Sequence, residues 1–61
     1  MGLFITFQYM DESPCMINAR RVLKVKEVPG GTKIWYADGR QFVVRETYVE
    51  VQKALMESKK R

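Results

Sequence analysis

Few residues of this 61-residue chain have side chains that could perform catalysis or hold a metal ion. The chain contains no histidine and one cysteine, Cys15. A Cys/His zinc site and any Ser-His-Asp or Cys-His catalytic arrangement are therefore excluded. Asp11 and Glu12 are adjacent, and neighbouring side chains of an extended segment point apart, so they form a poor acid–base pair. We expect a non-enzymatic protein without cofactor or metal, in which Cys15 is a small buried hydrophobic residue.

Basic residues are the second group that could have a function, because they could pair with phosphate groups. Eleven Lys and Arg stand against seven Asp and Glu, which gives a net charge of +4. Residues 20–45 carry most of the excess, and residues 59–61 are all basic. Without these last three residues, basic side chains would outnumber acidic ones by only one. The global charge is therefore weak support for nucleic-acid binding, and only the segment 20–45 favours it.

Within that segment, lysines alternate along a predicted strand and lie close in sequence to Trp35 and Tyr36. Nucleic-acid-binding surfaces combine these residue types, since bases stack on aromatic rings and phosphates pair with Lys and Arg. Lysines on a strand have a second use, because they prevent association of sheet edges. The candidate nucleic-acid-binding residues are Arg20, Arg21, Lys24, Lys26 and Lys33.

The length and the single cysteine limit the domain organisation and the compartment. We expect one domain over residues 1–58 and a basic tail over residues 59–61. One cysteine is typical of a reducing interior rather than of a disulfide-built secreted protein. The apolar run from Leu3 to Tyr9 is too short for a signal core or a membrane span. The sequence therefore predicts a cytoplasmic protein that does not insert into the membrane.

Aromatic and β-branched residues predict five strands, separated by turns rich in Gly, Pro and Asp. The third strand is irregular, because Val22 and Val25 are three residues apart while Leu23 and Val25 alternate with lysines. A β-bulge would reconcile the two patterns. The predicted strands cover residues 3–9, 15–17, 22–28, 33–37 and 41–45.

A helix is predicted to follow the last strand. Thr47 and Glu50 have the spacing of a capping box, in which each side chain bonds the backbone N–H of the other residue. Tyr48, Val51 and Leu55 recur at helical spacing, with Ala54 beside them, and predict a buried stripe. The expected fold is α+β, a small and mostly antiparallel five-stranded meander with this C-terminal helix packed on one face.

Two registers compete for the hairpin that turns at Asp38-Gly39. A two-residue type I′ loop would pair Trp35 with Phe42, whereas a type I turn with a bulge at Gly39 would pair Ile34 with Phe42. We favour the bulge, because it gathers four apolar residues on one face: Ile34, Tyr36, Phe42 and Val44.

In this register Leu23, Trp35 and Val43 lie on the opposite face, away from the helix. An exposed apolar patch usually marks an interface. Three interpretations remain open: the first hairpin covers these residues, a second copy of the chain covers them, or a foreign partner does. We expect self-association into a dimer or larger oligomer, through this face or an open sheet edge, with Leu23, Trp35 and Val43 as interface residues.

The order of several short motifs resembles the small bacterial flagellar proteins of the FlbD/SwrD type. The matching residues are Ile17-Asn18-Ala19, Val22, Val25, Pro29-x-x-Thr32, Ile34, Asp38-Gly39-Arg40-x-Phe42-Val43-Val44 and Glu46-Thr47-x-x-Glu50-Val51. The resemblance covers about residues 3–56. It implies a role in flagellar function and motor output, a flagellar protein partner, and neither enzymatic activity nor cofactor. The chain departs from the family at its first turn, Met10 to Ser13 instead of Asn-Gly, and at Trp35, where relatives tend to carry threonine.

A shorter stretch, from Val22 to Leu55, is similar to the first half of LytTR-type DNA-binding domains. Those domains continue with a strand region that supplies DNA-contacting loops, and this sequence has no counterpart of it. The leading hypothesis is therefore a non-enzymatic bacterial interaction protein of the flagellar type. The alternative is a small basic nucleic-acid-binding regulatory module.

Overall fold

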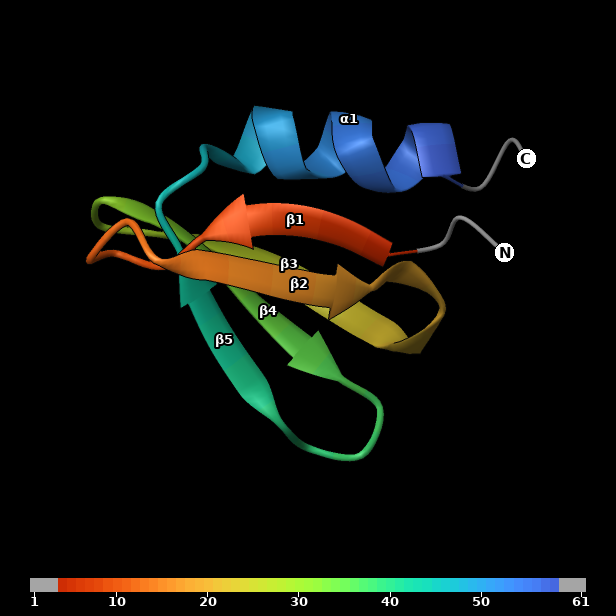
Figure 1. Cartoon of the computed structure of the whole chain (residues 1–61). Coiled ribbons are helices and arrows are strands. Elements are labelled where there is room, and N and C mark those ends of the chain that lie inside the picture. Colours follow the sequence, from red (N-terminus) through yellow and green to blue (C-terminus); the bar gives the residue numbers. More distant parts are fainter. Residues whose placement is uncertain (1–3, 59–61) are drawn as a thin grey trace.

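A computed structural model describes residues 4–58 of the chain. Five strands, a short 3₁₀ helix and one α-helix follow each other in these residues, so the predicted α+β class is confirmed (Figure 1). The elements are β1 (Phe4–Gln8), β2 (Pro14–Asn18), η1 (Ala19–Arg21), β3 (Val22–Val28), β4 (Gly31–Tyr36), β5 (Gln41–Val44) and α1 (Tyr48–Ser58). The predicted basic tail, residues 59–61, lies outside the described residues, and so do residues 1–3 of the predicted domain.

The strands form two antiparallel sheets instead of the single five-stranded sheet predicted from the sequence. β1 pairs with β2, and β3, β4 and β5 form a three-stranded sheet in that order. The chain leaves the predicted meander at η1, which begins after Asn18. The Asn18 side chain accepts a hydrogen bond from the Arg20 N–H at 3.0 Å and caps this turn. Because this turn redirects the chain and buries Ala19, β2 and β3 follow each other without pairing.

The hairpin of β1 and β2 is fixed to the end of β5 by a few directed contacts. Tyr9 and Val44 form an isolated antiparallel bridge. The Arg45 N–H donates to the Gln8 carbonyl at 2.8 Å, and the Gln8 N–H donates to Glu46 Oε1 at 3.1 Å. Arg45 also forms an ion pair with Glu12, at 2.8 Å. A further hydrogen bond, from the Asn18 N–H to the Tyr36 hydroxyl at 2.8 Å, joins the end of β2 to β4. The two sheets are therefore joined by separate contacts rather than by a continuous ladder.

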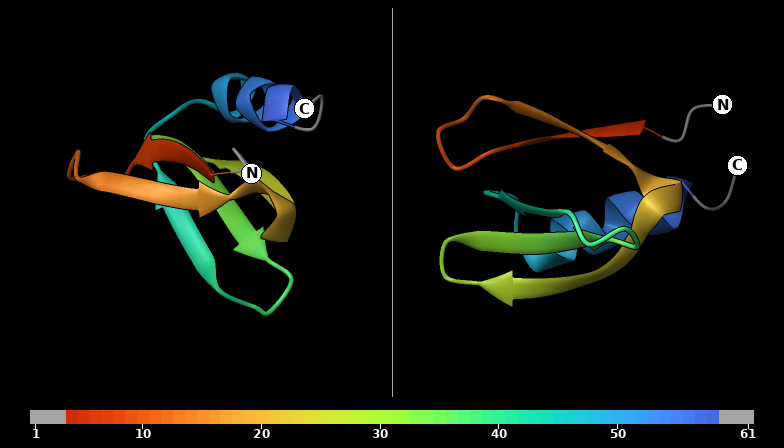
Figure 2. Two further views of the ribbon diagram at one scale, coloured as in Figure 1. Left: turned by 45° about the vertical axis from the view of Figure 1, so that its right-hand side comes forward. Right: turned by 90° about the horizontal axis from the view of Figure 1, so that it is seen from below.

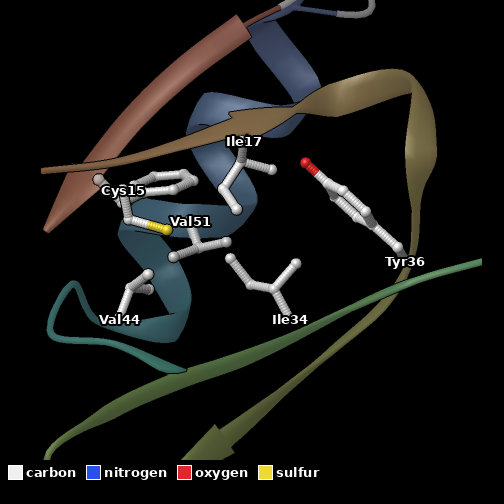
Figure 3. Packing of buried hydrophobic residues seen from close by; sticks show 7 residues of the cluster. Cys15, Ile17, Ile34, Tyr36, Val44 and Val51 are labelled. Atoms are coloured by element: carbon white, nitrogen blue, oxygen red, sulfur yellow. The ribbon is translucent and has the colours of Figure 1, made fainter. Parts of the chain in front are cut away.

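The hairpin and the three-stranded sheet form two layers, and α1 lies along one side of them (Figure 2). The core lies between these elements and takes residues from each of them (Figure 3). Cys15 is only 2% exposed, so its predicted role as a small buried hydrophobic residue is confirmed. The buried cluster consists of Phe7, Cys15 and Ile17 from the hairpin, Ile34, Tyr36 and Val44 from the three-stranded sheet, and Val51 from α1.

The capping box at the start of α1 forms as predicted. The Glu50 N–H donates to Thr47 Oγ1 at 3.2 Å, and the Thr47 N–H donates to Glu50 Oε1 at 2.9 Å. Val51 is fully buried, and Ala54 and Leu55 pack against the core. Tyr48 was predicted to belong to the same stripe, but it is 36% exposed. As the first helical residue, it lies beside the turn between β3 and β4, near Gly30 and Gly31, rather than over the core.

The two irregular features predicted for the three-stranded sheet are confirmed. The register of β3 against β4 shifts between Val22 and Lys24, which is the expected bulge. Ile34 pairs with Phe42, so the hairpin of β4 and β5 has the register with a bulge at Gly39. Gly39 has a φ of +96°, and its N–H closes the turn on the Tyr36 carbonyl at 3.1 Å.

Candidate interaction face

One face of the three-stranded sheet points away from the hairpin and from α1. Side chains alternate between the two faces of a strand, so Lys33 and Trp35 of β4 lie opposite the buried Thr32, Ile34 and Tyr36. The pairing places β3 and β5 residues beside them. We call this surface the outer face, and it comprises Leu23, Lys24, Lys26, Lys33, Trp35, Gln41 and Val43.

The structure answers which side of the sheet the first hairpin covers. Phe7, Cys15 and Ile17 of the hairpin pack into the cluster on the inner face, together with α1. The interpretation in which the hairpin folds over Trp35 and Val43 is therefore wrong. These two side chains are half-buried and lie outside the core cluster.

The three predicted interface residues lie on the outer face. Leu23 is 65% exposed and occupies the bulge. A bulge sets two residues of one strand against one residue of the next, so Leu23 and Lys24 share the position opposite Trp35. Val43 pairs with Lys33 on the neighbouring strand, two residues from the partner of Trp35. The three residues therefore come from three neighbouring strands of the same face.

The sequence predicts Trp35 as part of an exposed apolar patch, but in the structure two lysine ammonium groups lie over its ring. The Lys24 Nζ lies 4.7 Å from the centroid of the Trp35 ring, and the Lys33 Nζ lies 5.0 Å from it. Both distances are those of cation–π interactions. Sequence reasoning missed this arrangement, although the spacing contains a signal for it. Lys33 is two residues from Trp35 on the same strand face, and the bulge sets Lys24 opposite Trp35.

The outer face carries unbalanced positive charge. Lys26 and Lys33 are direct partners across β3 and β4, and Lys24 is the next outward-facing residue along β3. The salt bridges found within residues 4–58 join Arg40 to Asp38 and Arg45 to Glu12, so none of them involves these lysines. Like charges directly opposite each other destabilise a sheet.

The five candidate nucleic-acid-binding residues divide into two groups. Lys24, Lys26 and Lys33 gather on the outer face, whereas Arg20 and Arg21 belong to η1. The Arg21 carbonyl accepts a hydrogen bond from the Ala37 N–H at 3.0 Å, which places η1 beside the turn between β4 and β5.

The turn between β4 and β5 has its own charge balance. The pKa of the Asp38 carboxyl is lowered mainly by a hydrogen bond from the Arg40 backbone N–H, and further by the Arg40 guanidinium and the charge of Arg21. The carboxylate of Asp38 accepts from the Arg40 N–H and from Arg40 Nε, both at 3.0 Å. The positive charge at this end of the sheet is therefore partly neutralised within the chain, unlike that of the outer face.

The described part of the chain offers less support for a metal site, a membrane span or a ligand pocket. No group of three or more potential metal ligands occurs among residues 4–58. In the same residues, no helix is long and apolar enough to cross a membrane. A hollow of about 340 Å³ lies beside the start of α1, lined by Glu27, Arg45, Tyr48 and the Gly30-Gly31 turn. Arg45, the cation of this hollow, is already paired with Glu12.

Comparison with known proteins identifies the family. The family model FlbD, described as "Flagellar and Swarming motility proteins", matches residues 4–61, which is nearly the whole chain. No curated protein and no solved structure gave a significant match. The chain belongs to the FlbD family, so the resemblance found in the sequence is confirmed.

Proposed function

We propose that this flagellar-associated member of the FlbD family is a non-enzymatic cytoplasmic protein that binds another protein through its outer face. The observation that carries the proposal is the composition of that face. Leu23 is exposed, and Trp35 and Val43 lie on the same face, outside the core. An apolar patch of this kind, edged by charged residues, is typical of protein interaction surfaces.

Self-association, through the open edge of β3, is the second part of the proposal. A domain of about 60 residues buries only about 60% of the surface that its unfolded chain exposes, so association would add to a small core. β3 has β4 as its only strand neighbour in the described part of the chain, and Leu23 lies on β3. These features support self-association as the second part of the proposal.

Sedimentation of the natural chain tests self-association, and the substitution Trp35→Asp tests the use of the outer face. We expect the natural chain to sediment as a dimer or larger oligomer. We expect the variant to be folded by circular dichroism and to lose swarming when it replaces the natural copy in the source organism. The matched control is Met56→Asp, which adds the same charge at an apolar residue of α1 that is 57% exposed. A monomeric natural chain would contradict self-association, and normal swarming by the folded Trp35→Asp variant would contradict the use of the outer face.

Binding of nucleic acid is the second candidate function. The observation that favours it is the grouping of Lys24, Lys26 and Lys33 around an aromatic ring. Such binding weakens steeply as salt rises, because lysines that neutralise phosphates release counterions. Titration with single-stranded and duplex DNA and RNA at about 50 mM salt tests it. The absence of detectable binding there would remove this candidate.

A further inference from the structure

We infer that the outer face binds an acidic protein segment that also carries apolar side chains. Carboxylates of the segment would pair with Lys24, Lys26 and Lys33, and its apolar side chains would pack on Leu23 and Val43, on the same face as Trp35. The inference rests on the proposed function, which it narrows by naming the chemistry of the partner.

The first support is the like-charge pair at the centre of the outer face. Lys26 and Lys33 face each other directly, and neither takes part in a salt bridge found within residues 4–58. A sheet optimised for stability alone would place opposite charges at such a pair. Positions where a sequence departs from a local rule of this kind are expected at functional sites. A bound carboxylate between the two ammonium groups would turn the repulsion into attraction.

The second support is the mixture of charge and apolar surface, which favours a protein over a nucleic acid. Two lysine ammonium groups already lie within 5.0 Å of the Trp35 ring centroid, so a base that stacked on this ring would compete with them. Leu23 and Val43 offer aliphatic contacts, which suit the apolar side chains of a protein segment. Residues 4–58 carry eight basic and seven acidic side chains, so this part of the chain has little net charge with which to attract a duplex.

The same charges disfavour a second copy as the occupant. A two-fold contact between outer faces brings identical surfaces together, so each set of three lysines would meet another. Like charges placed opposite each other across an interface are costly and suppress wrong partners. An acidic segment meets the same lysines with the opposite charge.

Tryptophan fluorescence gives a direct test, because Trp35 is the only tryptophan of the chain. The probe is a synthetic peptide in which glutamates alternate with leucines, and the control peptide has glutamines in place of the glutamates. We expect the acidic peptide to change Trp35 emission, to bind about tenfold or more tightly than the glutamine peptide, and to lose affinity as salt rises.

The variant Lys26→Glu separates a role in binding from a role in stability. It replaces the like-charge pair with an opposite-charge pair, so we expect a higher Tm together with a loss of affinity for the acidic peptide of about tenfold or more. For Lys26→Gln, we expect a Tm and an affinity for the acidic peptide between those of Lys26→Glu and the natural chain. The matched control is Lys53→Glu, which makes the same change of charge on the exposed surface of α1 and should leave peptide affinity unchanged.

The remaining outcomes overturn the inference in distinguishable ways. Equal binding of both peptides would reject an acidic partner and leave the proposed protein interaction standing. Tighter binding of an oligonucleotide than of the acidic peptide would assign the outer face to nucleic acid and reject both proposals. A Trp35 signal that changes on dilution of the chain alone, in step with its sedimentation, would identify a second copy as the occupant. If neither peptide binds or changes Trp35 emission, the inference is rejected. The swarming assay of Trp35→Asp still decides the proposed function.

Discussion

At the scale of single residues, Gly31 lies where the first residue of β4 meets the end of β5. A Cβ atom at this position would overlap the carbonyl oxygen of Val44 and would come within 3.1 Å of the Arg45 Cα. Both neighbours are backbone atoms of the segment that the hairpin holds through the bond from the Arg45 N–H to Gln8. Gly39 differs, because its φ is positive but a Cβ there would meet nothing within 4 Å.

The two glycines make a matched pair of predictions. Gly31→Ala forces backbone atoms apart, and we expect it to lower the free energy of unfolding by about 3 kcal/mol. Gly39→Ala meets only the backbone penalty of a left-handed conformation, and we expect a loss of about 1 kcal/mol. Urea unfolding followed by circular dichroism measures both. Equal losses would show that the close approach at Gly31 costs no more than the backbone penalty at Gly39.

Residue-level features were predictable where they depend on near neighbours in sequence. The burial of Cys15 was predicted from its residue type and the absence of histidine, and the register at Gly39 from the turn chemistry and the apolar pattern. The exposure of Tyr48 was not predictable in the same way. Its helical spacing matches that of Val51, but its position in the first turn places it beyond the sheet that it was expected to cover.

At the scale of elements, the segment between β5 and α1 is fixed from three sides. The Thr32 hydroxyl, fully buried in β4, donates to the Glu46 carbonyl at 2.8 Å. The Glu46 carboxylate accepts from the Gln8 N–H of the hairpin, and Thr47 begins the capping box with Glu50. The start of the helix is therefore defined by side chains from a strand, a hairpin and the helix itself.

Removal of the cap tests the contribution of this start. Thr47→Ala leaves the Glu50 N–H without its side-chain acceptor, and we expect it to lower the free energy of unfolding by about 1 kcal/mol. Thr47→Ser keeps the hydroxyl and should stay close to the natural chain. Chemical unfolding compares the three proteins. If Thr47→Ala and Thr47→Ser were equally stable, the hydroxyl would contribute nothing to the helix.

At the scale of the whole molecule, the two sheets share one core although few backbone bonds join them. Ile17 of the hairpin, Ile34 of the three-stranded sheet and Val51 of the helix are all fully buried in one cluster (Figure 3). A two-stranded hairpin alone is marginal in water. The hairpin therefore depends on this cluster for its stability, and the cluster depends on the hairpin.

This interdependence predicts a single unfolding transition. Trp35 reports on the outer face of the three-stranded sheet, whereas Ile17 lies in the hairpin. We expect Ile17→Ala to cost about 2–5 kcal/mol and to shift the melting curves from Trp35 fluorescence and far-UV circular dichroism by equal amounts. Curves that separate in this variant would show that the hairpin unfolds independently.

The placement of the hairpin is the part of the fold that the sequence did not reveal. Its strands were predicted, because their residue types are local signals. Its packing against Ile34 and Val44 depends on contacts between residues far apart in the chain. It also depends on the direction in which η1 turns the chain between β2 and β3. The location of Leu23, Trp35 and Val43 opposite the helix was predictable from register alone, whereas the lysines over Trp35 required the structure.

The turn at Asp38-Gly39 has a consequence for how the chain tolerates changes of length. The turns after β1 and β3 lie together, since a Cβ at Gly30 would come within 2.9 Å of the Met10 side chain (Figure 1). Both turns adjoin the contacts between the hairpin and the end of β5. The turn between β4 and β5 faces open space and is closed by its own hydrogen bonds. Inserted residues or a fluorescent tag at Asp38-Gly39 would therefore extend into solvent, which makes this turn the natural attachment point for following the protein in a living cell.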